Sequence, residues 1–311
     1  MEESMDTNIL LESGTNELEI LEFMVSGNYY GINVAKIREI LTYNTLTPIP
    51  NAHPNVEGAF STRGETISII NLAKSLGMEE STDVKKDMFL ITNFNGINTG
   101  FHVHGVVGIH RVNWSAIIKP DSMINSASSS VATGIVNLDG KLVILLDFEK
   151  IVAEISPEVG IRLSDVDKLG KRKTCAAPIL YAEDSQLLST MIFDGLTKAG
   201  YVNLIPTNNG LELWEILQKY KEEGDVAKKV SCVVTDIEMP QMDGHRLLRL
   251  IRSDPQLKEI PVIIFSSLIN EEMQRKGERL GASAQLSKNE FGKFIETLDE
   301  LILDKEDKPN I

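Results

Sequence analysis

The sequence predicts two domains of different fold class: an all-β domain followed by an α/β domain with a doubly wound parallel sheet. The hydrophobic pattern changes near residue 170, from short strand-like runs to strands that alternate with amphipathic helices. The length of 311 residues suits two domains, and 42% hydrophobic with 24% charged residues is typical of globular proteins. We therefore expect domains over residues 16–154 and 176–304, joined by a polar linker over residues 155–175 that contains Pro157, Gly160 and Lys171.

In the first half, turn signals separate short apolar runs. An Asn-Gly pair at 95–96 and an Asp-Gly pair at 139–140 favour tight hairpins, because both residues of such turns adopt positive φ. Helical pattern is limited to about one turn each at Val34–Ile40 and Leu72–Leu76. The predicted strands are Leu18–Val25, Tyr29–Ile32, Thr66–Asn71, Met88–Asn93, Ile97–Val103, Val131–Leu138 and Lys141–Leu146. Many short strands at this spacing predict a β-barrel or sandwich.

In the second half, strands and helices alternate in five βα units. The predicted strands are Ile179–Ala182, Tyr201–Ile205, Val230–Val234, Val262–Phe265 and Ala284–Leu286. The predicted helices are Leu188–Leu196, Leu211–Tyr220, Gly244–Arg252, Glu271–Leu280 and Phe291–Ile302. This alternation predicts a doubly wound parallel sheet, in which a binding site lies at the carboxyl ends of the strands.

The charge of the chain argues against nucleic acid and anionic lipid as partners. The net charge is −14, with 22 acidic and 12 basic residues in positions 1–170 and 23 and 19 in the remainder. Both halves therefore repel phosphate backbones. Neither a membrane span nor a signal peptide is evident, so we expect a cytoplasmic protein without membrane insertion.

Chemistry-bearing side chains follow four of the predicted parallel strands. Glu183 and Asp184 follow the first strand, and Asp236 follows the third. Ser266 and Lys288 follow the fourth and fifth, so all are expected at one edge of the sheet. Clustered carboxylates favour a hard dication, and Mg²⁺ fits better than zinc, which prefers His or Cys. A lysine and a hydroxyl beside them predict phosphoryl transfer onto a carboxylate, whereas helix capping alone would not explain the whole set.

Four segments of the second half resemble, in order and spacing, the receiver domain of response regulators. They are ILYAEDS (179–185), TDIEMPQMDG (235–244), PVIIFSS (261–267) and GASAQLSK (281–288). The resemblance covers about residues 176–304 and implies a flavodoxin-like fold.

The resemblance also implies roles for individual residues. These are Asp236 as phosphoacceptor, Glu183, Asp184, Asp236 and the backbone carbonyl of Glu238 as Mg²⁺ ligands, Ser266 as switch hydroxyl, and Lys288 as the phosphate-pairing lysine. Two positions depart from the family pattern: Asn289 replaces the usual proline, and Gln285 replaces a common aromatic residue. A switch based on an aromatic ring is therefore not expected.

Segments of the first half resemble the CheW-like domains, the coupling-protein family of bacterial chemotaxis. They are NVAKIREI (33–40), TPIPNA (47–52), VEG (56–58), TRGE (62–65), IINL (69–72), and TGI (133–135) through LLD (145–147). The resemblance covers residues 16–154 and implies two intertwined five-stranded β-barrels. It also implies binding to methyl-accepting chemoreceptors and to the CheA histidine kinase, with Arg63, Ile37, Glu39 and Ile40 at protein interfaces. The two isoleucines fit core positions equally well, and Arg63 could be an ordinary surface charge.

No catalytic constellation is evident in the first half. His102 and His104 could place two imidazoles on one strand face, but the sequence offers no third metal ligand beside them.

A CheW-like domain followed by a receiver is the arrangement of the CheV family. It implies a phosphorylation-regulated adaptor, not an enzyme, that couples chemoreceptors to CheA and is recruited to membrane receptor arrays. Phosphorylation of Asp236 would tune adaptation, and the receiver face around 267–279 and Gln285 would contact the β domain. One alternative is a phosphate sink tethered to the array. Another is an aspartyl-phosphate phosphohydrolase, which needs a second aspartate where Glu238 stands. A transcriptional regulator is disfavoured by the acidic charge.

Overall fold

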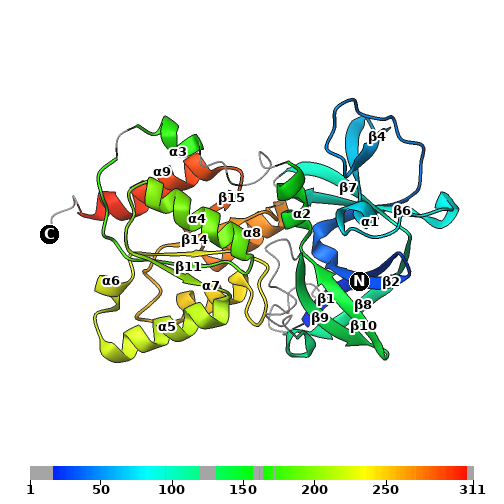
Figure 1. The fold of residues 1–311 in the computed structure, drawn as a ribbon. Coiled ribbons are helices and arrows are strands. Elements are labelled where there is room, and N and C mark those ends of the chain that lie inside the picture. The colour runs from blue at the N-terminus through cyan, green and yellow to red at the C-terminus, as the bar shows by residue number, and fades with distance from the viewer. Residues whose placement is uncertain are drawn as a thin grey trace, which may run out of the picture.

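A β domain and an α/β domain lie side by side in the computed structural model of the protein (Figure 1). The structure describes residues 17–94, 96–118, 131–156, 161, 164–170, 172–269 and 271–306. The sequence features noted at Asn95, Pro157, Gly160 and Lys171 lie outside the described residues. The predicted order of an all-β fold followed by a parallel α/β fold is confirmed.

The β domain consists of two five-stranded sheets, with strand orders β8-β1-β2-β10-β9 and β3-β6-β7-β5-β4. The strands are β1 (Glu17–Val25), β2 (Asn28–Asn33), β3 (Ile37–Thr42), β4 (Val56–Thr62), β5 (Glu65–Asn71), β6 (Met88–Phe94), β7 (Ile97–Val103), β8 (Gly105–Asn113), β9 (Ala132–Leu138) and β10 (Lys141–Leu146). The chain enters the first sheet, crosses to the second for β3 to β7, and returns to the first. This path intertwines the two sheets.

Each sheet of the β domain closes on itself. Ile118, which follows β8, pairs with Ile135 of β9 through two backbone hydrogen bonds of 2.8 Å. In the other sheet Thr47, which follows β3, pairs with Ala59 of β4 through bonds of 2.8 and 2.9 Å. Because the outer strands of each sheet are joined, the prediction of two intertwined five-stranded barrels is confirmed.

Two local predictions in the β domain were wrong. The helical turn expected at Val34–Ile40 ends after the short 3-10 helix η2 (Val34–Lys36), because Ile37 begins β3 and pairs with Thr92 of β6. Helix α2 (Phe148–Ile155) was not predicted. Asp147 caps its start by accepting a hydrogen bond from the Lys150 backbone amide at 3.0 Å, and Phe148 is fully buried. Helix α1 (Leu72–Ser75) and the 3-10 helices η3 (Val84–Lys86) and η4 (Trp114–Ala116) complete the domain.

The α/β domain has one five-stranded parallel sheet in the order β12-β11-β13-β14-β15. Its strands are β11 (Ile179–Ala182), β12 (Leu204–Thr207), β13 (Cys232–Thr235), β14 (Val262–Ser266) and β15 (Ala284–Ser287). Its helices are α4 (Gln186–Lys198), α5 (Gly210–Glu223), α6 (Val226–Lys229), α7 (Gly244–Ser253), α8 (Glu271–Leu280) and α9 (Phe291–Glu306). The second strand begins later than predicted, because Tyr201 forms an isolated bridge with Cys175.

Successive residues of each buried strand face opposite sides of this sheet. Ile179 and Tyr181 of β11 pack with α4 and α9, whereas Leu180 and Ala182 pack with α5 and α7. The segment expected to be a polar linker contains helix α3 (Ser164–Lys168), whose Val166 is buried in the core beside α9. The C-terminal part of the connection between the domains, helix α3, is therefore packed onto the α/β domain.

Candidate functional site

Three carboxylates meet at the carboxyl edge of the parallel sheet. Glu183 and Asp184 directly follow β11, and Asp236 directly follows β13, its neighbour in the sheet. Ligand oxygens from these residues lie within 4.8 Å of one another, and no other such group was found among the described residues. Glu183 and Asp236 are buried, whereas Asp184 is exposed to solvent. The arrangement is one that hard dications bind.

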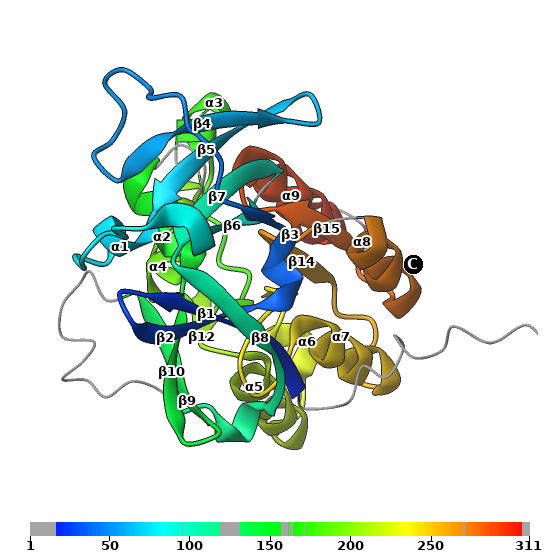
Figure 2. The same ribbon diagram turned by 90° about the vertical axis from the view of Figure 1, so that its right-hand side faces the viewer.

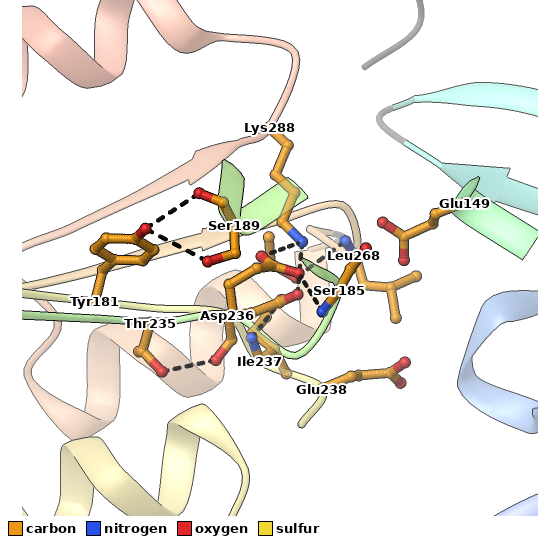
Figure 3. A network of polar contacts seen from close by, with 12 residues as sticks. Glu149, Tyr181, Ser185, Ser189, Thr235, Asp236, Ile237, Glu238, Leu268 and Lys288 are labelled. Atoms are coloured by element: carbon orange, nitrogen blue, oxygen red, sulfur yellow. Dashed lines mark hydrogen bonds and ion pairs between the residues drawn. The ribbon is translucent and has the colours of Figure 1, made fainter. Parts of the chain in front are cut away.

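Lys288 holds two of these carboxylates together. Its Nζ lies 2.7 Å from Asp236 Oδ2 and 2.8 Å from Glu183 Oε2 (Figure 3). Burial opposes the charge of Lys288, but the neighbouring carboxylates Asp236, Glu183 and Glu149 outweigh it and raise its pKa well above the usual value. The other oxygen of Asp236, Oδ1, accepts the Ile237 backbone N–H at 2.6 Å. Asp236 is thus fixed at both oxygens.

Asp243 and Gly244, which end the TDIEMPQMDG segment, explain how the loop after β13 fits against Asp236. Asp243 caps α7 by accepting the Arg246 N–H at 2.8 Å. A Cβ atom on Gly244 would lie 2.0 Å from the backbone carbonyl oxygen of Asp236, which is too close for any other residue. Glycine at this position therefore allows the helix to begin directly beside Asp236.

Among the described residues, the three carboxylates of this cluster outnumber the single lysine, Lys288, that is paired with them. Burial, followed by the charges of Asp236 and Asp184, raises the pKa of Glu183 well above its usual value, although Lys288 opposes the shift. Burial also raises the pKa of Asp184 to about 7, with Asp236 and Asp147 adding to it. Solvent at Asp184 lessens that shift. Both directions indicate a site that a bound cation would stabilise, and the oxygen donors fit Mg²⁺.

The hydroxyl of Ser266 lies at the end of β14, beside the acidic cluster. It is buried, and its Oγ accepts the Leu268 backbone N–H at 3.2 Å. Gln285 does not point toward this site: its Nε2 donates to the Gln274 carbonyl of α8 at 2.7 Å, and its side chain packs on Gly277. Gln285 therefore contacts α8 within the α/β domain rather than the β domain expected from the sequence.

The β domain covers this edge of the sheet. A cavity of about 390 Å³ between the domains is lined by Glu183, Asp184, Asp236 and Lys288 from one side and by Lys36 and Glu149, among others, from the opposite side. Lys36 Nζ lies 3.0 Å from Glu149 Oε1 and 3.7 Å from Glu238 Oε2. Asn33 Nδ2 donates to Glu238 Oε1 at 2.7 Å.

Two carboxylates at this domain contact have opposite pKa shifts. Burial opposes ionisation of Glu149, but the charges of Lys36 and Lys288 and a hydrogen bond from Ser267 lower its pKa to about 2. Burial instead raises the pKa of Glu238 to about 8, with Lys36 opposing the shift. Glu149 is therefore an anion held by groups from both domains, while Glu238 Oε2 has no hydrogen-bond donor.

The residues expected at partner interfaces lie on the β domain away from the acidic cluster. Arg63 and Gly64 form the β4–β5 turn, with φ values of +49° and +82°. The Arg63 side chain is 74% exposed and lies 3.3 Å from Glu39. Ile40 is 38% exposed, whereas Ile37 packs against the core of the domain. Arg63 and Ile40 are thus accessible to a partner, whereas Glu39 is mostly buried and Ile37 is largely a core residue.

Within the part of the chain that the structure describes, no third ligand joins His102 and His104 in a group that could hold a metal. His102 lies between two carboxylates instead, with Nδ1 2.7 Å from Glu57 Oε2 and Nε2 3.0 Å from Asp87 Oδ2. Burial opposes its protonation, but these two partners outweigh burial and raise the pKa of His102. His104 accepts the Ser26 backbone N–H at 2.9 Å. Each ring nitrogen of His102 thus has a carboxylate partner, and we call this group the paired cluster.

Sequence reasoning missed Asn33, Lys36 and Glu149, the β-domain residues at the acidic site. Asn33 and its partner Glu238 are separated by 205 positions, and Lys36 and Glu149 by 113. Each residue is ordinary in its local context, since Asn33 caps η2 and Glu149 lies in the first turn of α2. The expected contact of Ser267 with the β domain is present, through Glu149.

Comparison with known proteins relates both domains to bacterial chemotaxis. The CheW-like domain model matches residues 19–156, and the response regulator receiver domain model matches residues 179–299. Chemotaxis protein CheV3 of Helicobacter pylori is 30% identical over 306 residues, which cover 93% of this chain and 96% of that protein. CheV2 of the same organism is 28% identical, covering 92% and 95%.

A shorter relative matches the first domain alone. Chemotaxis protein CheW of Thermotoga maritima is 28% identical over 151 residues, covering 49% of this chain and 98% of that protein.

Among the described residues, no helix has the length and apolar character required to cross a membrane.

Proposed function

The chain belongs to the CheV family of chemotaxis proteins, and we propose that it is a phosphorylation-regulated adaptor coupling chemoreceptors to a CheA-type histidine kinase. The β domain would bind receptor and kinase, with Arg63 and Ile40 on its accessible face and Glu39 and Ile37 supporting them. The α/β domain would accept a phosphoryl group from the kinase on Asp236 and thereby tune adaptation. The protein would act in the cytoplasm, at receptor arrays.

The observation that carries the phosphoacceptor assignment is the position of Asp236. Its carboxylate lies 2.7 Å from Lys288 and within 4.8 Å of the Glu183 and Asp184 ligand oxygens. In the transfer, a bond forms between an Asp236 carboxylate oxygen and phosphorus as the donor's phosphorus–nitrogen bond breaks. Lys288 would leave its place between the two carboxylates and pair with the phosphoryl oxygens, and Ser266 would donate its hydroxyl to one of them.

The proposed metal ligands are Glu183, Asp184, Asp236 and the backbone carbonyl of Glu238. Mg²⁺ bound there would neutralise charge on the transferred phosphoryl group. The side chain of Glu238 is occupied by Asn33 and faces Lys36. That engagement leaves it poorly placed to serve as a general acid, which favours an adaptor over a phosphohydrolase.

Phosphate incorporation and complex formation test the two halves of this function. Incubated with Mg²⁺ and phosphorylated CheA, the wild-type chain should gain one acid-labile phosphoryl group, and Asp236→Asn should gain none. Asp194→Asn, an exposed acid on α4, is the matched control. Both variants should still co-sediment with receptor–kinase complexes. Incorporation of phosphate by Asp236→Asn would contradict the assignment of Asp236 as the phosphoacceptor. If neither the wild-type chain nor any variant co-sediments with receptor–kinase complexes, the proposed adaptor function is contradicted.

A further inference from the structure

The domain contact is built directly on the acidic site, and it consists of few polar groups. From the β domain come Asn33 and Lys36 at η2 and Glu149 at the first turn of α2. From the α/β domain come Glu238, two residues after Asp236, and Ser267, next to Ser266. We name these five residues the interdomain latch. Figure 3 shows Glu149 directed toward the pair formed by Asp236 and Lys288.

Glu149 occupies a position that resembles that of a bound anion. It accepts a hydrogen bond from Ser267 and is attracted to both Lys36 and Lys288. A phosphoryl group on Asp236 would require the same lysine, Lys288, together with Ser266, the neighbour of Ser267. Lys288 pairs with Asp236 and Glu183 and attracts Glu149 at longer range, so Glu149 and a phosphoryl group on Asp236 would compete for the positive charge of Lys288.

Charge balance makes this competition unequal. Of the described residues, two lysines and six carboxylates line the cavity between the domains: Lys36 and Lys288, and Asp147, Glu149, Glu183, Asp184, Asp236 and Glu238. A phosphoryl group adds a charge of about −1.5 to −2 at neutral pH. Glu238 Oε2 already lacks a hydrogen-bond donor, which weakens the contact before any charge is added.

We infer that the interdomain latch holds the β domain over the unphosphorylated site through the contacts of Lys36 with Glu149 and of Asn33 with Glu238, and that a phosphoryl group on Asp236 releases the latch by engaging Lys288 and repelling the carboxylates of Glu149 and Glu238. This inference rests on the proposed phosphorylation of Asp236 and adds how that event reaches the β domain. A second groove, of about 340 Å³, is lined by Ala35, Ile37 and Arg38 together with Leu268 and Ile269. Release would therefore uncover the start of β3.

The start of β3 is also the start of the surface proposed to bind partners. Viewed from the β domain, β3 lies over the region of β14 and α8 (Figure 2). Glu39 and Ile40 continue the same strand and lead to Arg63. Opening at Lys36 would thus change access to a neighbouring partner surface without requiring a change in the barrel itself.

Trp114 offers a direct probe of the latch because it lines the same cavity. The chain has two tryptophans, Trp114 and Trp214. In the variant Trp214→Phe, all tryptophan fluorescence therefore comes from Trp114. Beryllofluoride with Mg²⁺ should shift Trp114 emission and raise hydrogen exchange in residues 31–38 and 147–152, and Asp236→Asn should abolish both changes. If the mimic protects residues 265–288 but leaves Trp114 and these two segments unchanged, the latch inference is wrong while the proposed function stands. If the wild-type chain does not bind the mimic, the proposed function itself is contradicted.

A charge-removing variant tests Glu149 specifically. Glu149→Gln retains the shape and the Ser267 contact but loses the charge that attracts Lys288, so it should bind beryllofluoride about 5-fold or more tightly than wild type. Glu154→Gln, an exposed acid on the same helix, should bind as wild type does. Equal affinity of Glu149→Gln, Glu154→Gln and wild type would overturn the assigned competition.

Discussion

Each domain buries a cluster of charged side chains, and the two clusters differ in how their charge is balanced. In the β domain, His102 contacts Glu57 on one side and Asp87 on the other, and these two carboxylates raise its pKa. In the α/β domain, Lys288 bridges Asp236 and Glu183 while Asp184 and Glu238 have raised pKa values. A paired cluster stabilises the fold, whereas an excess of carboxylate creates a demand for a cation. Burial alone does not distinguish these two cases.

Removing one carboxylate from the acidic cluster should weaken metal binding most. Asp184→Asn replaces an anionic oxygen by a neutral one, so Mg²⁺ affinity should fall about 10–100-fold. Without Mg²⁺, the variant should unfold at a denaturant concentration equal to or higher than wild type, because a repulsive charge is gone. Isothermal titration calorimetry and urea unfolding measure these quantities. Unchanged Mg²⁺ affinity would remove Asp184 from the site.

The corresponding change in the paired cluster should act on stability instead. Asp87→Ala leaves the buried Nε2 of His102 without its partner, which should lower the free energy of unfolding by about 1–3 kcal/mol. Mg²⁺ affinity should not change. If Asp87→Ala weakened Mg²⁺ binding as strongly as Asp184→Asn, the distinction between the two clusters would fail.

The meeting of Glu183, Asp184 and Asp236 at one edge of the sheet could be predicted because its signals are local. The string from Asp236 to Gly244 fixes both the carboxylate and the glycine that lets α7 approach it, and α8 begins and ends where predicted. The β3 strand was missed because Val34, Ile37 and Ile40 recur at every third position, which resembles one face of a helix over so few residues. The contact of Lys36 with Glu149 was missed because only the tertiary fold brings together residues 113 positions apart.

Two buried histidines should give the domains opposite responses to pH. His245 in α7 is buried beside Lys276, Asp243 and Arg249, and burial lowers its pKa to about 4. Unfolding lets His245 take up a proton below about pH 6.5, so its contribution to stability is lost as pH falls toward 4. His102 has a raised pKa, so its contribution is complete below about pH 6.5 and is lost as pH rises through that higher value.

Variant differences isolate these two contributions. The free energy of unfolding of wild type minus that of His245→Gln should decrease from pH 7 to pH 5. The corresponding difference for His102→Gln should increase over the same range. Urea unfolding at several pH values gives both slopes, and slopes of the same sign would mean that one of the two environments is misassigned.

The smallest stability effect is expected at Arg63, the exposed member of the pair with Glu39. Arg63 is 74% exposed, and surface ion pairs contribute little, so Arg63→Ala should unfold as wild type does. Its affinity for receptor–kinase complexes should nevertheless fall. Arg111→Ala is the matched control, because Arg111 is 66% exposed and pairs with Glu19 on the other sheet. Equal binding by both variants would place the partner surface elsewhere.

Kinase activity in a reconstituted receptor array is the measurement that most directly tests phosphorylation-dependent coupling. Receptors, CheA and this protein are combined, and phosphotransfer from ATP is followed with the wild-type chain held by beryllofluoride and with Asp236→Asn. We expect kinase activity to differ between the two, because the mimic alters how the β domain engages its partners. If the mimic binds to Asp236 and kinase activity is identical in both, the α/β domain is a phosphate sink tethered to an adaptor.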